Sequence, residues 1–248
     1  MSNVKAKKKG AYLPAYRDRE PHWAFSVQAY VKNGQVYHRN STWDSTVRLR
    51  AKKMYHDNAD YYKGFSASPD VGHCEAGDLR CKVQAAQAWV TKNLPMRGFR
   101  SWPGRAAKEG MNSGEASDIE KSRILYRLLK DMKIEARFAL FHDYLRSSVD
   151  ESFPQLESLD SLALLVKQQG DLASDLWIDP ACEYCELGEV PHWMQKTQAL
   201  VVDYDFEGMA TKPKYRAEFQ SVSGKVRNPG QYVRKYEVAL KGSGDARV

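Results

Sequence analysis

The chain contains no apolar run that approaches the roughly 20 residues of a membrane-spanning helix. Its first nine residues carry four lysines and lack the hydrophobic core of a secretory signal. The sequence therefore predicts no membrane span. It is compatible with a cytoplasmic protein and with a trimmed piece of a longer exported chain.

The chain also has no recognised nucleic-acid-binding motif. Its net charge of +7 is moderate, part of that charge lies in the Lys5–Lys9 cluster, and the other basic residues are interspersed with acidic ones. Such a cluster is typical of a solvated tail, so we do not expect nucleic acid as a partner. A protein, a peptide or a glycan is the expected partner. Apolar residues at 42% and charged residues at 28% indicate an ordinary globular protein.

Cysteine is scarce, and the four cysteines form two close pairs, Cys74 with Cys81 and Cys182 with Cys185. An even number and local pairing favour two disulfides, which would indicate an extracytoplasmic location, periplasmic or on the cell surface. The alternatives are unpaired structural thiols, a four-thiolate zinc site and a redox pair. The gap between Cys182 and Cys185 suits a zinc knuckle, but the longer gap of the other pair does not. A redox pair would be expected at the start of a helix, whereas Cys182 follows Asp179-Pro180 in a predicted loop. We therefore expect neither a metal nor a cofactor.

Hydrophobic periodicity predicts helices first and strands afterwards. Asn33-Gly34 is a hairpin turn signal between two alternating segments. Pro95 ends one predicted helix, and residues 96–114 are expected to form an irregular connection. The expected helices are 43–62, 79–94 and one that begins at Ser117. The expected strands are 23–31, 35–38, 137–141, 162–166, 176–178, 200–202, 215–222 and 232–240.

This order of elements predicts an α+β fold with strands at both ends of the chain. We divide the chain into four parts. A basic irregular tail covers 1–21, a β-hairpin covers 22–40, and the core covers 41–211. The last part, 212–248, is expected to form a β-hairpin that begins a following β-domain.

The segment 117–136 carries the most specific signal. It reads SDIEKS at 117–122 and KIEA at 133–136. It resembles the core of bacterial transglutaminase-like proteins, in which a Gly-Asp-Cys-x-Asp-x-Ala segment opens a helix that ends in Gly-Ile-x-Ala. Residues 177–180 (WIDP) resemble the Trp-Leu-Asp-Pro segment of that family, and residues 159–166 resemble the start of its histidine strand. The resemblance covers about residues 13–205 and implies a papain-like core of helices packed on an antiparallel sheet.

In that family a thiolate at the start of the helix is the nucleophile, a histidine is the base and an aspartate orients the histidine. The resemblance puts Asp118 on the cysteine, Ser161 on the histidine and Asp179 on the aspartate. Asp118 cannot react as a thiol, and Ser161 cannot accept a proton near neutral pH. The resemblance therefore implies a catalytically degenerate member, and we assign no catalytic residue. The cleft-lining candidates are Ser117, Glu120, His142 and Trp177.

The start of the same helix also has a simpler explanation. Ser117 and Glu120 have the spacing of a capping box, and Asp118 adds negative charge at the positive end of the helix dipole. These three residues are therefore expected to stabilise the helix. They would also leave Asp118 available to face cationic groups of a ligand.

We expect a non-catalytic domain (a pseudoenzyme) that acts as a binding or assembly module, as part of a bacterial cell-envelope protein. The alternative is an active transglutaminase-like enzyme, or a cysteine or serine hydrolase, with a non-standard nucleophile. That nucleophile would be a serine near His142 and Asp143, or Cys182 or Cys185 near His192. Paired carboxylates from Asp118, Glu120 and Asp179 could instead perform glycosidic chemistry. The sequence identifies neither the ligand nor the oligomeric state.

Overall fold

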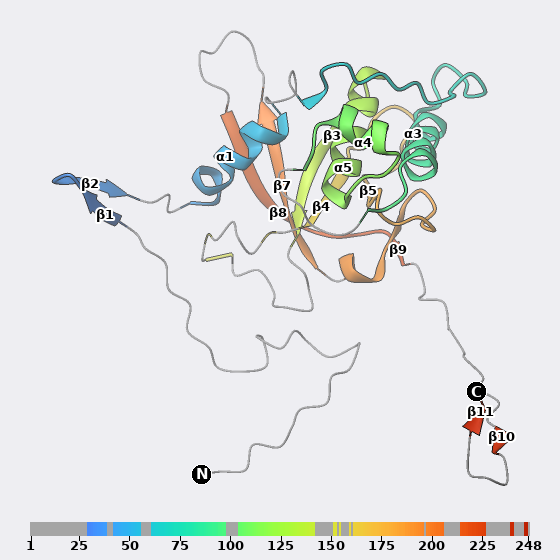
Figure 1. The fold of residues 1–248 in the computed structure, drawn as a ribbon. Coiled ribbons are helices and arrows are strands. Elements are labelled where there is room, and N and C mark those ends of the chain that lie inside the picture. Colours follow the sequence, from blue (N-terminus) through green and yellow to red (C-terminus); the bar gives the residue numbers. More distant parts are fainter. Residues whose placement is uncertain are drawn as a thin grey trace.

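The computed structural model describes twelve stretches of the chain, and the account below concerns these alone (Figure 1). They are 29–38, 42–55, 61–97, 104–141, 151–152, 154, 159, 161–195, 197–205, 214–226, 239–240 and 246–247. The described elements include both helices and antiparallel strands. The predicted α+β class is therefore confirmed, while the papain-like identity of the core stays a prediction.

Five strands form the central sheet in the order β5-β4-β3-β7-β8, and every neighbouring pair is antiparallel (Figure 1). Three short ladders accompany it: β1 with β2, β10 with β11, and β6 with β9, of which only the last is parallel. The central strands are β3 (Ala136–Phe141), β4 (Ser161–Val166), β5 (Leu176–Ile178), β7 (Gln198–Asp205) and β8 (Lys214–Ser221). The short strands are β1 (Ala29–Lys32), β2 (Gln35–His38), β6 (Glu189–Val190), β9 (Lys225–Val226), β10 (Ala239–Leu240) and β11 (Ala246–Arg247).

The α-helices of the described part share one hydrophobic cluster with one face of this sheet. α5 packs on β4 and β3, α3 and α4 pack on α5, and α1 packs on β8 and β7 (Figure 1). The helices are α1 (Trp43–Tyr55), α3 (Leu79–Asn93), α4 (Ala107–Ser113) and α5 (Asp118–Asp131), and a short 3-10 helix, η3, covers His192–Met194. None of them has the length and apolar character needed to cross a membrane.

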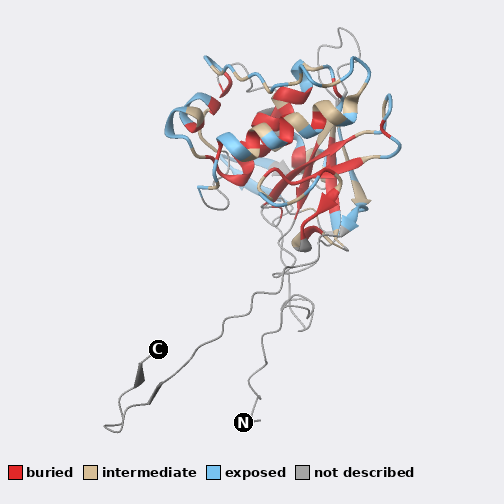
Figure 2. Cartoon of the chain, turned by 90° about the vertical axis from the view of Figure 1, so that its right-hand side faces the viewer, coloured by how far each residue is buried: buried red, intermediate tan, exposed pale blue. Residues whose placement is uncertain are grey.

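Alternation along the strands gives the sheet two buried faces. Phe138 and Leu140 of β3 face the helices, whereas Ala139 and Phe141 belong to a second cluster on the opposite face. The segment around β6 and η3 supplies Val190 and Met194 to that second cluster. Figure 2 shows the result, with buried residues running through both α5 and the strands.

Local sequence signals account for several element ends. Asn33 and Gly34 have φ values of 51° and 75°, the left-handed pair that a tight hairpin turn between β1 and β2 requires. The side chain of Asp78 caps α3 by accepting a hydrogen bond from Cys81 N at 2.7 Å. The predicted hairpin turn and the predicted end of this helix before Pro95 are confirmed.

Some predicted elements differ from the structure. The predicted irregular connection contains α4. α1 covers Trp43–Tyr55, while residues 56–60 of the predicted helix 43–62 lie outside the described part and Tyr61 is helical. α4 has seven residues, which is too short for hydrophobic periodicity to reveal. β8 pairs with β7 along its whole length, so residues 214–221 join the core sheet. Of the predicted strand 232–240, residues 239–240 pair with β11. Residues 232–238 lie outside the described part of the chain.

Both cysteine pairs are disulfide-bonded, with Cα–Cα distances of 5.7 Å for Cys74–Cys81 and 5.5 Å for Cys182–Cys185. The predicted disulfides are therefore confirmed. Unpaired structural thiols and a four-thiolate zinc site are excluded, because every cysteine of the chain is bonded. For the same reason, the proposal that Cys182 or Cys185 is a free catalytic thiol is wrong.

The hydroxyl of Tyr55 joins α1 to the sheet. It accepts a hydrogen bond from Phe138 N at 3.1 Å and donates one to Val202 O at 2.6 Å. Phe138 and Val202 lie opposite each other in the register of β3 and β7, so the hydroxyl bridges the two strands where they face each other. Burial raises the pKa of Tyr55 far above its ordinary value, and the hydroxyl stays neutral as both donor and acceptor.

Tyr55→Phe should lower the free energy of unfolding by about 2–4 kcal/mol, because it leaves one buried N–H and one buried carbonyl without this partner. Urea denaturation followed by circular dichroism measures the loss. Tyr61→Phe is the matched control, since the Tyr61 hydroxyl is also buried but has no hydrogen-bond partner among the described residues. We expect Tyr61→Phe to be neutral or stabilising. Equal losses in the two variants would contradict the bridging role of Tyr55.

Candidate functional site

The start of α5 is the place where the sequence predicts a degenerate site, and α5 is buried nearly all round. Eleven of its fourteen residues are buried, including every residue of its first two turns (Figure 2). A sequence pattern of apolar and polar positions suggested an amphipathic helix with a solvent-facing side. The structure instead covers that side, so the polar residues of the first turns are buried as well.

Ser117 and Glu120 form the predicted capping box. Ser117 Oγ accepts a hydrogen bond from Glu120 N at 3.3 Å, and Glu120 Oε2 accepts one from Ser117 N at 2.9 Å. Arg105 binds the same carboxylate through its backbone N, 2.5 Å from Oε1, and through Nη2, 3.3 Å from Oε2. Burial alone would raise the pKa of Glu120, but the hydrogen bonds from Arg105 and Ser117 lower it below its ordinary value. Ser117 and Glu120 are therefore parts of a helix cap.

The three triad positions lie at the same end of the sheet. Ser122 Oγ donates a hydrogen bond to Leu162 O at 2.8 Å, which ties the first turns of α5 to the start of β4, where Ser161 lies. Asp179 directly follows β5, and the negative charge of Asp118 acts on its carboxyl group. The exposed fractions are 5% for Asp118, 6% for Ser161 and 5% for Asp179. The structure thus brings these positions together but leaves almost no surface through which a substrate could reach them.

Asp179 is held by two hydrogen bonds and is strongly perturbed. Its Oδ1 accepts a hydrogen bond from Ala181 N at 2.9 Å, and its Oδ2 accepts one from Trp193 Nε1 at 3.1 Å. Burial raises the pKa of Asp179 to about 6, and the charge of Asp118 adds to this rise. The two hydrogen bonds and the charge of Lys121 oppose the rise only in part. Asp179 therefore gains or loses its proton in the mildly acidic range.

Lys121 is a member of this group that the sequence analysis missed. Its side chain is fully buried, and its Nζ has no hydrogen-bond partner among the described residues. Burial lowers the pKa of Lys121, while the charges of Glu183 and Asp179 oppose that fall. The available signal was its position three residues after Asp118, which places both side chains on one face of the helix. A charged side chain at such a position is usually exposed, and only the tertiary structure shows that the face is covered.

The two further predicted cleft residues are Trp177 and His142. Trp177 is 3% exposed and packs in the second hydrophobic cluster, with its ring centroid 6.1 Å from that of Phe141. It supports β5 from the face opposite α5, so it belongs to the core and does not line a cleft. His142 and Asp143 lie outside the described residues, and the serine-hydrolase alternative built on them is not tested.

The start of α5 offers carboxylates, hydroxyls and one ammonium group. Glu120 cannot join Asp118 and Asp179 in glycosidic chemistry, because Arg105 and Ser117 bind both of its oxygens. Asp118 and Asp179 remain as a buried pair beside Lys121. Paired carboxylates need an open groove for a sugar, and neither of these two is accessible.

A possible metal-ligand cluster lies elsewhere. One ligand atom each of His73, Cys74 and Cys81 falls within 4.8 Å of the others. Metal binding by cysteine requires the thiolate, and both sulfurs are bonded to each other as a disulfide. This cluster is therefore not a metal site in the oxidised protein.

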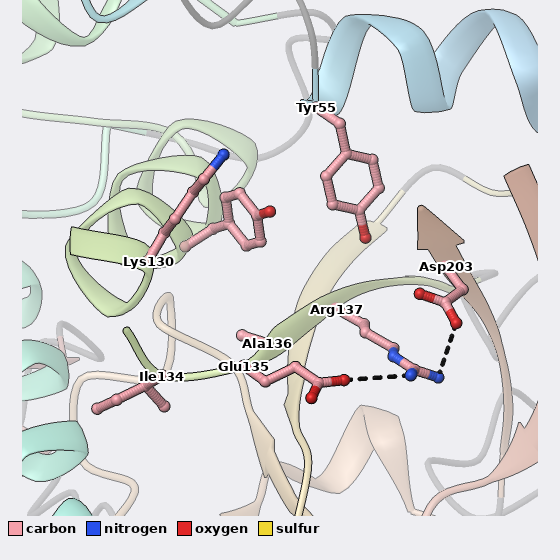
Figure 3. Close-up of a pocket in the computed structure, with 8 residues that line it drawn as sticks. Tyr55, Lys130, Ile134, Glu135, Ala136, Arg137 and Asp203 are labelled. Atoms are coloured by element: carbon pink, nitrogen blue, oxygen red, sulfur yellow. Dashed lines mark hydrogen bonds and ion pairs between the residues drawn. The ribbon is translucent and has the colours of Figure 1, made fainter. Parts of the chain in front are cut away.

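A separate small cleft of about 250 Å³ lies at the opposite end of α5 and β3 (Figure 3). Arg137 crosses it and forms ion pairs with Glu135 and Asp203, each at 3.2 Å. Its charge is thereby already paired, and the cleft is smaller than the roughly 300–1,000 Å³ of common ligand pockets. A helix rises about 1.5 Å per residue, so Lys130 at this cleft lies about 18 Å along α5 from Asp118. The lining residues are Tyr55, Tyr126, Lys130, Ile134, Glu135, Ala136, Arg137 and Asp203.

Comparison with known proteins gives little likeness. No family model and no curated protein matches the chain. The crystal structure of a protein from Parabacteroides distasonis, described as a candidate protease, is similar with a TM-score of 0.40 and 11% sequence identity. The match covers 72% of this chain and 41% of that protein, so the chain spans less than half of its length.

Lys121→Met should raise the free energy of unfolding by about 1–3 kcal/mol, because it replaces a buried, unpartnered ammonium group with an apolar side chain of similar length. Urea denaturation at pH 5 measures the gain. Lys130→Met, at an exposed position of the same helix, is the control and should change stability by less than about 0.5 kcal/mol. A clear loss of stability in Lys121→Met would show that the ammonium group has a stabilising partner.

Asp179 should make the protein less stable as the pH rises from about 4 to 6. In this window the folded protein keeps a proton on Asp179 that the unfolded chain, with its ordinary pKa of 3.8, releases. The contribution should fall by about 3 kcal/mol across the window and then level off. Urea midpoints of the wild type and Asp179→Asn, measured from pH 4 to 8, test this. Asp179→Asn should lack this decline, and parallel curves for the two proteins would refute it.

Proposed function

We propose that the chain is a non-catalytic transglutaminase-like domain that serves as a binding or assembly module, as part of a bacterial cell-envelope protein. Protein, peptide or glycan is the proposed partner class. The residues at the start of α5, the two disulfides and the β1–β2 hairpin support it.

The proposal rests on the residues that occupy the predicted nucleophile and base positions. Asp118 stands at the first position of α5, where the resemblance puts a nucleophilic thiol, and its side chain is 5% exposed. A carboxylate beside the Ser117–Glu120 cap stabilises the positive end of the helix dipole. Ser161 offers a hydroxyl where a base is needed, and a hydroxyl does not accept protons near neutral pH. These substitutions support a fold that is retained without acyl-transfer chemistry.

The disulfides support the proposed location. Disulfides persist in oxidising compartments and are rare in the cytosol. Cys74–Cys81 and Cys182–Cys185 account for all four cysteines of the chain. An extracytoplasmic location, in the periplasm or on the cell surface, is consistent with this cysteine usage.

The hairpin β1–β2 supports a role in assembly. Tyr30, Val31 and Val36 are 51%, 68% and 58% exposed, although they are large apolar side chains. A two-stranded hairpin is only marginally stable by itself, and exposed apolar surface of this kind favours contact with another surface. The hairpin is therefore the described element best suited to an assembly contact.

Rebuilding the triad tests whether the three positions have the proposed geometry. In the double variant Asp118→Cys with Ser161→His, the helix dipole and a neighbouring imidazolium should lower the pKa of the new thiol by about 2 units relative to an ordinary thiol. The ultraviolet absorbance of the thiolate, followed against pH, measures this pKa even in a buried site. Ser68→Cys, at an exposed position of the loop before α3, provides the ordinary thiol in the same protein.

A thiol in the double variant that titrates like that of Ser68→Cys would contradict the assignment of these positions. The wild type should also incorporate no labelled primary amine into a glutamine-bearing peptide and should hydrolyse no amide bond in it. A saturable activity of either kind that Asp118→Ala abolishes would overturn the non-catalytic proposal.

A further inference from the structure

The turn that carries Cys182 and Cys185 includes one residue of the predicted degenerate site, Asp179. It begins at Asp179, whose backbone O accepts a hydrogen bond from Cys182 N at 3.1 Å. The side-chain Oδ1 of the same residue accepts one from Ala181 N at 2.9 Å. The carboxyl group that belongs to the degenerate site thus also shapes the turn of the disulfide.

The disulfide is accessible from solvent on one side. Cys182 and Cys185 are both partly exposed, and the two residues between them, Glu183 and Tyr184, are exposed. Tyr184 is 75% exposed, so the turn presents an aromatic side chain to solvent. An external thiol can therefore approach this pair without unfolding the domain.

The buried ammonium group of Lys121 interacts electrostatically with the turn. The charges that act on it are those of Glu183 in the turn and Asp179 at its base. Its Nζ has no hydrogen-bond partner among the described residues while the disulfide is closed. A cation near a cysteine stabilises its thiolate form. Opening of the disulfide would thus add a further negative group to the turn whose charges already act on Lys121.

The turn is held by contacts that do not depend on the disulfide. Gln87 Nε2 of α3 donates a hydrogen bond to Cys185 O at 3.3 Å, and Trp193 Nε1 donates one to Asp179 Oδ2 at 3.1 Å. The cross-link itself spans a sequence separation of three, and short loops gain little stability from a cross-link. The two cysteines should therefore stay in place when the bond opens, and the bond can form again.

The other disulfide is partly exposed as well, but it differs in loop length and in its neighbouring basic group. Cys74–Cys81 spans a separation of seven and joins a loop to the first turn of α3, so it closes a longer loop. The exposed imidazole of His73 lies beside it, with Nε2 3.7 Å from Cys74 Sγ, whereas the ammonium group of Lys121 is buried. Cys74–Cys81 offers an internal comparison within one molecule.

We propose that Cys182–Cys185 is a redox-active disulfide that exchanges with external thiols in the folded protein, with Lys121 stabilising the released thiolate. The thiolate of an external thiol attacks one sulfur of the pair, forms a mixed disulfide with it and breaks the Cys182–Cys185 bond. A second external thiolate attacks the mixed disulfide and leaves as the oxidised external disulfide. The two electrons of the external thiols, and through solvent their protons, end on the two cysteines. This activity is separate from acyl transfer, so its failure would leave the proposed function untouched.

Thiol exchange of the native, full-length chain tests the proposal. The protein is incubated with reduced glutathione, samples are quenched by alkylation, and peptide mass spectrometry reads the two disulfides separately. Cys182–Cys185 should open at least about tenfold faster than Cys74–Cys81, at glutathione concentrations that leave the far-ultraviolet circular dichroism unchanged. Equal rates, earlier opening of Cys74–Cys81, or opening only after unfolding would overturn the proposal.

The role of Lys121 has its own readout. At equilibrium in a glutathione buffer, Lys121→Met should lower the ratio of reduced to oxidised Cys182–Cys185 about tenfold and leave that of Cys74–Cys81 unchanged. Lys130→Met is the matched control and should change neither ratio. An unchanged ratio in Lys121→Met would remove Lys121 from the proposal. A cysteine-containing peptide that opens the pair faster than glutathione would identify polypeptide thiols as the substrate class, and the reverse would identify small thiols.

Discussion

Burial of α5 between the other helices and the central sheet is the constraint on which the rest of the structure depends. A helix covered on nearly every side cannot leave its first turn to solvent, so the free N–H groups there need protein partners. Ser117 and Glu120 supply them, and Arg105 in turn neutralises Glu120. The loop that contains Arg105 approaches the cap so closely that a side chain on Gly104 would meet Glu120 Cγ at 2.9 Å. The start of α5 thus determines the position of the loop that contains Arg105, the Arg105–Glu120 ion pair and the glycine at position 104.

The same burial explains the chemistry of the degenerate site. Asp118, Asp179 and Lys121 are charged groups removed from water, and each environment disfavours the isolated charge. Asp179 responds by holding its proton to about pH 6, with hydrogen bonds from Ala181 and Trp193. Lys121 has charges nearby but no hydrogen bond among the described residues. Buried groups that are only partly satisfied cost stability, so their presence is informative about function.

Asp179 connects two features that look unrelated in the sequence. It is the position that the family resemblance gives to the orienting acid of the triad, and it is also the residue on which the Cys182–Cys185 turn is built. Under the proposed function, no acyl-transfer chemistry requires this acid to orient a histidine. The acid instead shapes the turn, and its charge interacts with that of Lys121. The proposed non-catalytic function and the proposed redox activity of this region are therefore compatible.

Elements with strong local signals could be predicted from the sequence. Asn33-Gly34 allowed only a tight hairpin turn, Ser117 and Glu120 had the spacing of a capping box, and the close cysteine pairs could bond with little loop to close. Each of these depends on residues within a few positions of one another. The α+β class followed from the order of such segments.

The tertiary structure alone decided which surfaces are covered and which strands are neighbours. Hydrophobic periodicity did not reveal that β8 pairs with β7, because pairing depends on the packing of α1 on both strands. It also could not reveal that Lys121 is fully buried, since a helix position is read as exposed or buried only relative to what packs on it. The hydroxyl of Tyr55 binds Phe138, which is 83 positions away in the chain, and Val202, which is 147 positions away. Contacts of that range carry no local signal, so only the folded chain shows them.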